Sequence, residues 1–295
     1  MSISAETVRQ LREETGAGMM DCKGALVEAQ GDMGKARDLL RKKGLAAAAR
    51  KASRVASEGA IGSSIGEGSR HGVIVEVNCE TDFVAKTPGF QALVKDVAAH
   101  VAAHAPADVA TLAGQAFARL PGRTVGEAVQ EAIAVIKENI VVRRFARFEL
   151  AAGASGVVAA YVHPPAAKVG VLVELAPESA DPGTLAALAK DVAMHVAAAS
   201  PAAALYVSKD EVPAEVLEKE KEIYRAQALA SGKPANVVDK IAEGKIKEYY
   251  GTFCLLEQPY IREPKENVGQ HLKGKASVRR FVRFRLGEES GTKAE

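Results

Sequence analysis

The spacing of apolar residues predicts three short helices over residues 4–44. Ser4, Asp21 and Asp32 each precede an apolar stripe at helical spacing, and such residues favour helix N-caps. A bundle of about forty residues buries little apolar surface, so we expect a small module that docks onto another part of the protein or a partner. Residues 45–57 (LAAAARKASRVAS) then predict a basic, helical connector.

Two later stretches share one apolar pattern and nearly one sequence. Residues 92–103 (ALVKDVAAHVAA) match residues 187–198 (ALAKDVAMHVAA) at ten of twelve positions. Residues 142–150 (VRRFARFEL) match residues 278–286 (VRRFVRFRL) at seven of nine. Alternating runs before each helix predict a strand hairpin, and the second match predicts a closing strand. One α+β unit is therefore present twice.

The connectors between hairpin and helix differ between the two copies. The first contains NCETDFVAKTPGF and the second contains APESADPGT. From Glu76 to Lys95 is nineteen residues, whereas from Glu174 to Lys190 is sixteen, so the first connector is three residues longer. Because the second copy shows what the scaffold requires, the surplus of the first is a candidate functional element. It is centred on Thr81, Asp82, Phe83 and Val84. We favour an interaction loop in which Phe83 anchors a partner; the alternative is that Phe83 folds back as a lid over the sheet.

The second copy also contains an insertion. The offset between the copies is 95 at the helix and 136 at the closing strand, so the second copy holds 41 extra residues. They form two amphipathic patterns joined by SGKP, which predicts an antiparallel helical hairpin that projects as an arm. The expected parts are an amino-terminal three-helix domain (1–52), a first core subdomain (53–150), a second core subdomain (151–212 and 258–287) and the arm (213–257).

Composition adds few constraints. The chain is 47% hydrophobic and 26% charged, with a net charge of +2, which neither requires nor excludes nucleic acid. Three separated cysteines without a CxxC pair predict no disulfide framework and no zinc site. No signal sequence and no apolar stretch of membrane-spanning length is present, so we expect a cytoplasmic protein.

Motifs for small-molecule chemistry are weak. Residues 269–276 (GQHLKGKA) resemble a phosphate-binding loop, but Ala276 replaces the Ser or Thr that would hold magnesium, and a helix rather than a strand precedes the segment. His100 and His104 have a metal-compatible spacing, yet His195 repeats only the first of them, which favours packing. No catalytic set can be assembled, so we expect no enzyme activity, no cofactor and no bound metal.

Two binding alternatives remain open. The strands RRFARF and RRFVRF could stack RNA bases, since exposed aromatic residues between arginines form such platforms. In period two, however, one face reads Val142, Arg144, Ala146 and Phe148, which is mostly core. The adjacent Met19 and Met20 could belong to a loosely packed small core, or could lie at a partner surface, where methionine is common.

At these residues the chain resembles the elongation factor Ts family. The motifs are TGAGMMDCKGAL (15–26) and VEVNCETDFVAK (75–86), and SGKP, VGQHLKG and YIREP also fit. The resemblance implies an amino-terminal domain of the ubiquitin-associated type, a core of two related α+β subdomains, a helical-hairpin arm and a short carboxy-terminal module.

The resemblance also implies a guanine-nucleotide exchange factor that binds elongation factor Tu with its GDP. Asp82 and Phe83, flanked by Thr81 and Val84, would enter the GTPase domain, and magnesium and GDP would leave so that GTP can bind. Secondary contacts would map to Arg12, Met19, Met20 and His163. Ile136-Lys137 departs from the Ile-Gly that the family often has. The resemblance implies no direct nucleic-acid contact, and it allows a dimer of two such heterodimers.

Overall fold

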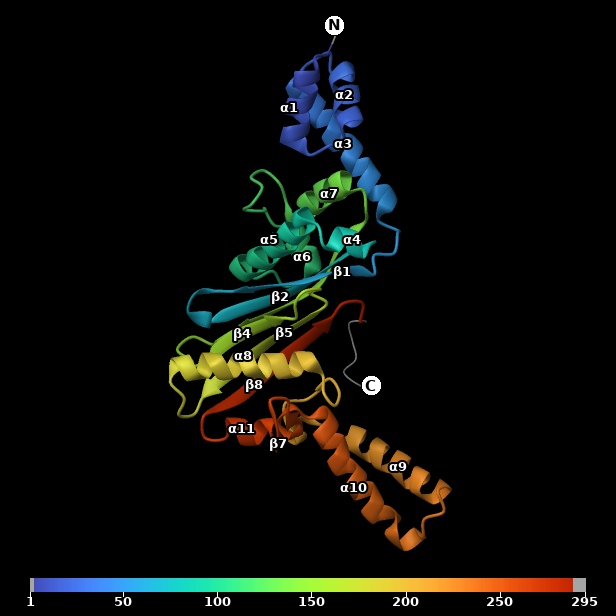
Figure 1. Cartoon of the computed structure of the whole chain (residues 1–295), viewed down its shortest axis with the longest axis vertical. Coiled ribbons are helices and arrows are strands. Elements are labelled where there is room, and N and C mark those ends of the chain that lie inside the picture. The colour runs from blue at the N-terminus through green and yellow to red at the C-terminus, as the bar shows by residue number, and fades with distance from the viewer. Residues whose placement is uncertain (1–2, 289–295) are drawn as a thin grey trace.

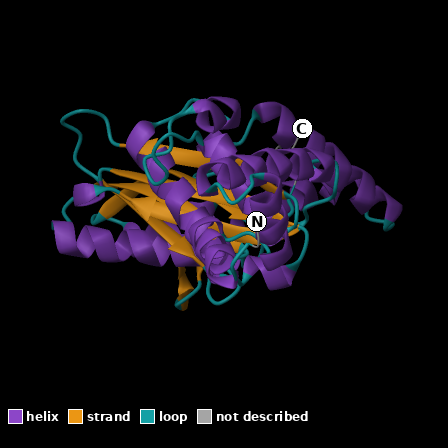
Figure 2. Cartoon of the chain, turned by 90° about the horizontal axis from the view of Figure 1, so that it is seen from above, coloured by secondary structure: helices purple, strands orange, loops and turns teal. Residues whose placement is uncertain are grey.

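The computed structural model describes residues 3–288 and has the α+β fold that the sequence predicts. The molecule is elongated (Figure 1), with the amino-terminal helices at one end and a helical hairpin at the other. Two small sheets lie between these ends (Figure 1), and the view from above shows helices lying over the near side of the strands (Figure 2).

Three helices form the amino-terminal part. Ser4 and Asp32 cap the first and third helices as predicted, by accepting hydrogen bonds from the backbone N–H groups of Thr7 and Lys35. The prediction that Asp21 caps the second helix is wrong, because Gly18 holds the N-cap position and Asp21 lies in the first turn. The third helix extends to Lys51 and so includes about half of the predicted connector, residues 45–57. The helices are α1 (Ala5–Thr15), α2 (Met19–Glu28) and α3 (Met33–Lys51).

The first unit is a three-stranded antiparallel sheet in the order β1-β2-β3, covered on one face by helices. Two elements that the apolar pattern did not predict, α4 and α6, are too short to show a helical period. The elements are β1 (Glu58–Ile65), the 3-10 turn η1 (Glu67–Ser69), β2 (His71–Cys79), α4 (Asp82–Ala85), α5 (Pro88–His104), α6 (Val109–Gly114), α7 (Val125–Ile136) and β3 (Ile140–Glu149).

The second unit repeats this arrangement with strand order β4-β5-β8 and the long helix α8 on its outer face. Between α8 and β8 the chain forms the predicted hairpin of α9 and α10. The elements are β4 (Val157–Val162), β5 (Val169–Pro177), α8 (Pro182–Ala198), η2 (Lys209–Glu211), α9 (Ala214–Ala230), α10 (Ala235–Phe253), η3 (Leu255–Glu257), β6 (Pro259–Tyr260), β7 (Glu263–Asn267), α11 (Val268–Leu272) and β8 (Ala276–Arg285).

The two sheets pack face to face through a shared apolar layer that includes Ile74 and Leu172. Two cation–π contacts join the copies reciprocally. The guanidinium of Arg144 lies 4.3 Å from the ring centre of Phe284, and that of Arg280 lies 4.3 Å from the ring centre of Phe148. Because each contact joins equivalent positions of opposite copies, the copies are related by an approximate two-fold axis.

A buried glutamate anchors each of these arginines. Glu76 is fully buried and accepts a 2.7 Å hydrogen bond from the Arg144 Nε. Its counterpart Glu174 accepts one of the same length from the Arg280 Nε. A buried carboxylate needs such a partner, because desolvation of an unpaired charge is costly.

The predicted alternation of the closing strand is wrong at its start. A β-bulge lies opposite Glu76 and Val77, so that Glu76 pairs with Arg144 and Val77 pairs with Val142. An extra residue in one strand reverses which side chains share a face. Val142 and Phe145 therefore both pack on the core between sheet and helices.

Candidate functional site

The surplus of the first connector folds as the one-turn helix α4. Thr81 has an extended backbone, and its hydroxyl accepts a 3.3 Å hydrogen bond from the Val84 N–H, which is N-cap geometry. At the other end the Thr87 hydroxyl donates to the Val84 carbonyl at 2.8 Å. Hydroxyl groups thus satisfy backbone groups at both ends, and a four-residue helix can form where no long apolar stripe exists.

Phe83 points away from the protein. Its exposed fraction is 79%, whereas Ala85 is buried and Val84 packs against the core. All eight phenylalanines lie within the described residues, and the other seven are buried or half-buried. Successive helical residues point about 100° apart, so anchoring Val84 and Ala85 inward directs Phe83 outward. The alternative in which Phe83 is a lid over the sheet is wrong.

Asp82 lies at the first position of α4. Its carboxylate accepts a 2.6 Å hydrogen bond from the Nζ of Lys86, one turn later. This hydrogen bond, with the positive charges of Lys86 and Lys168, lowers the pKa of Asp82. Asp82 therefore carries a negative charge beside the exposed ring at neutral pH.

The β4–β5 turn of the second copy borders the same region. The Ala167 carbonyl accepts a 2.7 Å hydrogen bond from the Ile61 N–H of β1, and Lys168 forms a 2.8 Å ion pair with Glu58. His163 is exposed at the start of this turn, and its Nδ1 lies 3.0 Å from the hydroxyl of Tyr161. The turn therefore places His163 on the part of the second copy that contacts β1.

Arg12, Met19 and Met20 are all exposed in the amino-terminal helices. Met20 has an exposed fraction of 75%, so the alternative that the two methionines form a small core is wrong. Met20 borders a cleft of about 630 Å³ between these helices and α7.

An ion pair of 3.3 Å, between the Nζ of Lys137 and Asp21, crosses this cleft. Lys137 has a left-handed backbone (φ 72°) at the end of α7, a position that glycine adopts at lower cost. The departure from Ile-Gly therefore places a lysine in a left-handed conformation at the end of α7.

Glu138 was missed by the sequence analysis. Its carboxylate accepts hydrogen bonds from the backbone N–H groups of Glu80 and Thr81 and from the Thr81 hydroxyl. In the sequence, Glu138 is only a single acidic residue between the end of α7 and the start of β3. That signal does not reveal a partner 57 residues earlier in the chain.

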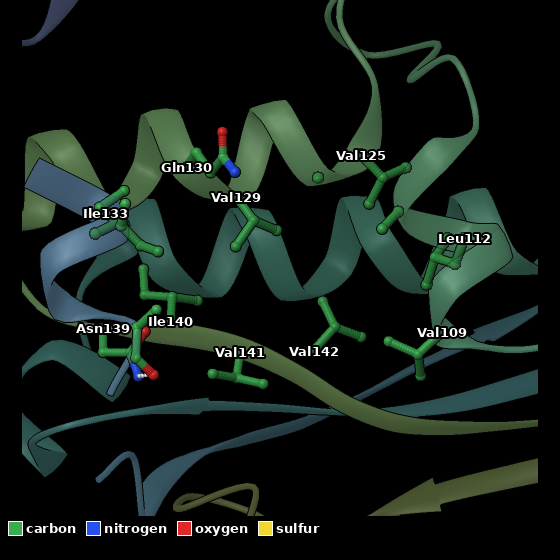
Figure 3. A pocket seen from close by; sticks show the side chains of 15 residues that line it. Val109, Leu112, Val125, Val129, Gln130, Ile133, Asn139, Ile140, Val141 and Val142 are labelled. Carbon is green, nitrogen blue, oxygen red and sulfur yellow. Dashed lines mark hydrogen bonds between the residues drawn. The ribbon is translucent and has the colours of Figure 1, made fainter. Parts of the chain in front are cut away.

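The apolar cavity of about 280 Å³ beneath α7 is lined mainly by aliphatic side chains (Figure 3), and its Asn139 amide donates to a backbone carbonyl of the chain after α3. Within residues 3–288 no three His, Cys, Asp or Glu side chains are placed to hold a metal ion. The three cysteines are free and buried. No helix in the described part is long and apolar enough to cross a bilayer.

The candidate nucleotide and metal motifs have structural explanations. The expectation that a helix precedes residues 269–276 is wrong, because Gly269 lies inside α11, which directly follows the strand β7 of a two-stranded ribbon and precedes β8. The segment begins within a helix, so it does not form the loop between strand and helix that a phosphate-binding motif needs. The Nε2 of His100 lies 3.0 Å from the Oε1 of Gln115, and that of His195 lies 3.0 Å from the Oε1 of Gln258. Burial lowers the pKa of both histidines, which favours neutral packing side chains.

The aromatic residues of the two arginine-rich strands are covered. Phe148 and Phe284 are buried between the sheets, and Phe145 and Phe281 pack on the two helix-side cores. Base stacking requires an exposed ring. The arrangement therefore gives no support to RNA stacking on these strands.

Comparison with known proteins gives one consistent result. The family model described as "Elongation factor TS" matches residues 80–288. The chain is 50% identical to the elongation factor Ts of Syntrophotalea carbinolica, over 98% of this chain and 94% of that protein. It is 47% identical to that of Trichlorobacter lovleyi, over 98% and 94%, and 45% identical to that of Thioalkalivibrio sulfidiphilus, over 100% and 96%. The chain therefore belongs to the elongation factor Ts family.

Proposed function

We propose that this chain accelerates the release of GDP from elongation factor Tu by inserting the Phe83 side chain as a wedge into the GTPase domain, with Asp82 beside it near the magnesium site. The observation that carries the proposal is the exposed Phe83 ring on α4, an element without a counterpart in the second copy. Membership of the family implies, more generally, a nucleotide exchange factor for elongation factor Tu in translation.

Nucleotide exchange of this kind uses the binding energy between the two proteins, and the exchange factor makes or breaks no covalent bond. Magnesium bridges the phosphates of a bound nucleotide and neutralises their charge, so dislodging it weakens the hold on GDP. An aromatic ring that fills a pocket of the partner contributes strongly to the binding free energy. The negative charge of Asp82 interacts electrostatically with a nearby cation such as magnesium. Thermodynamic linkage makes the effect reciprocal: the exchange factor lowers the affinity of elongation factor Tu for GDP, and GDP lowers the affinity of elongation factor Tu for the exchange factor by the same ratio. GTP then binds the emptied site.

Within this proposal the residues Thr81, Asp82, Phe83 and Val84 divide their roles. Asp82 and Phe83 face outward and contact the partner. Thr81 and Val84 hold α4 from within, through the N-cap and the core. The exposed Arg12, Met19, Met20 and His163 provide secondary contacts.

The test measures stimulated release of a fluorescent GDP analogue from elongation factor Tu. Phe83→Ala is expected to slow the stimulated release by about thirtyfold or more, because truncating an aromatic anchor costs about 2 kcal/mol or more. The matched control is Ile261→Ala, which truncates an exposed apolar side chain of the second copy. If both variants keep wild-type stimulation and fold normally, Phe83 is not the wedge.

A further inference from the structure

The start of α4 is held by one side chain from a distant part of the chain. We infer that Glu138 is a positioning residue that sets the direction of Phe83 by clamping the residues immediately before it. The inference rests on the proposed role of Phe83, and it adds a residue that makes no outward contact of its own.

The clamp consists of three hydrogen bonds. One carboxylate oxygen of Glu138 accepts from the Glu80 N–H at 3.1 Å and from the Thr81 N–H at 3.0 Å. The other accepts from the Thr81 hydroxyl at 2.6 Å. Hydrogen bonds to an ionised carboxylate are stronger than neutral ones. The three described hydrogen bonds of this side chain thus all end on residues 80 and 81.

The Thr81 hydroxyl links Glu138 to the helix α4 through two hydrogen bonds. It donates to Glu138 and at the same time accepts from the Val84 N–H. A hydroxyl has one proton to donate, so the bond to the carboxylate leaves its lone pairs directed at the helix. Fixing Thr81 therefore fixes the first turn of α4, and Phe83 lies in that turn.

The residues on either side of Glu138 tie the clamp to the rest of the molecule. The Asn139 N–H donates to the Glu80 carboxylate at 2.6 Å, and the Asn139 amide donates to the Arg54 carbonyl at 2.8 Å. Lys137 pairs with Asp21 of the amino-terminal helices. The tripeptide of residues 137–139 thus joins α2, the chain after α3 and the start of α4.

The second copy shows that the scaffold does not need this carboxylate. There the N–H groups of residues 178–180 donate to the Lys275 carbonyl, a backbone group. Ser179, the counterpart of Thr81, donates its hydroxyl to the carbonyl of Gly274, the counterpart of Glu138. A glycine and its backbone are sufficient where no wedge follows. Among the described residues, a charged side chain from outside the connector holds the backbone N–H groups of the connector only in the first copy, which carries Phe83.

The first experiment uses the free protein and does not depend on the partner. Amide hydrogen exchange over residues 80–85 is compared in wild type, Glu138→Ala and Glu138→Gln. We expect about tenfold faster exchange in Glu138→Ala, since a charge-assisted site is lost, and near wild-type exchange in Glu138→Gln, whose amide oxygen still accepts the two N–H groups. Unchanged protection in Glu138→Ala overturns the inference.

The second experiment measures stimulated GDP release with the same variants. We expect Glu138→Ala to lower the maximal stimulated rate by about tenfold, which corresponds to about 1.36 kcal/mol in the activation free energy. Glu138→Gln should recover most of the rate. The matched control is Ser179→Ala, which cuts the equivalent link in the second copy and should leave the rate unchanged.

A double variant separates positioning from general damage. If Glu138 acts through Phe83, then Phe83→Ala with Glu138→Ala is no slower than Phe83→Ala alone. Additive losses, or a full rate in Glu138→Ala beside a reduced rate in Phe83→Ala, overturn the inference and leave the wedge intact. A full rate in Phe83→Ala instead overturns the proposed function, whatever the amide exchange has shown about the clamp.

Discussion

The two copies of the repeated unit solve the same connection in different ways. After β5 the chain reaches α8 through a short turn held by the backbone carbonyl of Lys275. After β2 it forms α4, held by the Glu138 side chain, and presents an exposed Phe83. The closing strand, the buried glutamate and the long helix are the same in both copies. At this connection, the copies therefore differ in the connector and in the group that supports it.

The second copy shows which features the repeated unit needs in order to fold. A feature present in both copies, such as the reciprocal arginine–phenylalanine contacts, belongs to the scaffold. A feature of one copy alone requires another reason, and here that reason is an outward-facing aromatic residue. Variants made at equivalent positions test each assignment.

The largest effect on stability is expected at the buried glutamates. Glu76→Ala should lower the free energy of unfolding by about 3–5 kcal/mol, because it leaves Arg144 without its buried partner. Glu174→Ala should cost less, because its partners Arg279 and Arg280 are more exposed than Arg144 and are rehydrated more easily. Urea unfolding of the two variants measures the difference, and equal costs would show that solvent exposure of the arginines is irrelevant.

A smaller effect concerns pH and the histidines of the two long helices. Burial lowers the pKa of His195 and of His100. As the pH falls, the unfolded chain therefore binds protons at these histidines before the folded chain does. The free energy of unfolding has its full value above about pH 6.5 and decreases as the pH falls through the lowered pKa that these histidines have in the folded chain. Both ring nitrogens of His195 are engaged, with Gln258 and the Ile261 N–H, whereas the Nδ1 of His100 has no hydrogen-bond partner within residues 3–288.

We expect His195→Gln to flatten the pH dependence of unfolding more than His100→Gln does. Urea midpoints measured at about pH 7.5 and about pH 5.5, on either side of the usual histidine pKa, give this comparison. A steeper dependence in His195→Gln than in wild type would show that the sign is wrong.

The smallest effect is expected at the end of α7. Lys137 has a φ of 72°, whereas its counterpart Lys273 has a φ of −51°. Lys137→Gly should raise the free energy of unfolding by up to about 1 kcal/mol through relief of the left-handed backbone, less the small contribution of an exposed ion pair with Asp21. Lys273→Gly should instead lower it, because glycine only increases the freedom of the unfolded chain. Thermal unfolding of both variants decides the order.

The sequence predicted the repeated units, the arm and the position of the surplus, because long apolar periods and internal identity are local signals. The pattern at SGKP and Pro213, for instance, placed the hairpin of α9 and α10 correctly. It did not predict α4, because a single turn has no period and depends on the cap at Thr81.

Tertiary contacts explain the remaining differences. The bulge opposite Glu76 moved Val142 to the other face, and strand alternation alone contains no sign of it. The role of Glu138 depends on a contact with Thr81 that only the folded chain creates. The exposed ring of Phe83, in contrast, was predicted, because the second copy showed that the fold does without it.

The most direct test of the central claim exchanges the connector itself. Residues 80–89 are replaced by residues 178–184 of the second copy, which keeps a glutamate and a hydroxyl at the positions of Glu80 and Thr81 and removes α4. Stimulated release of labelled GDP from elongation factor Tu is then measured, with circular dichroism as the check on folding. We expect a folded protein in whose presence GDP release is no faster than without any exchange factor. A folded exchange variant that stimulates release as wild type does would contradict it.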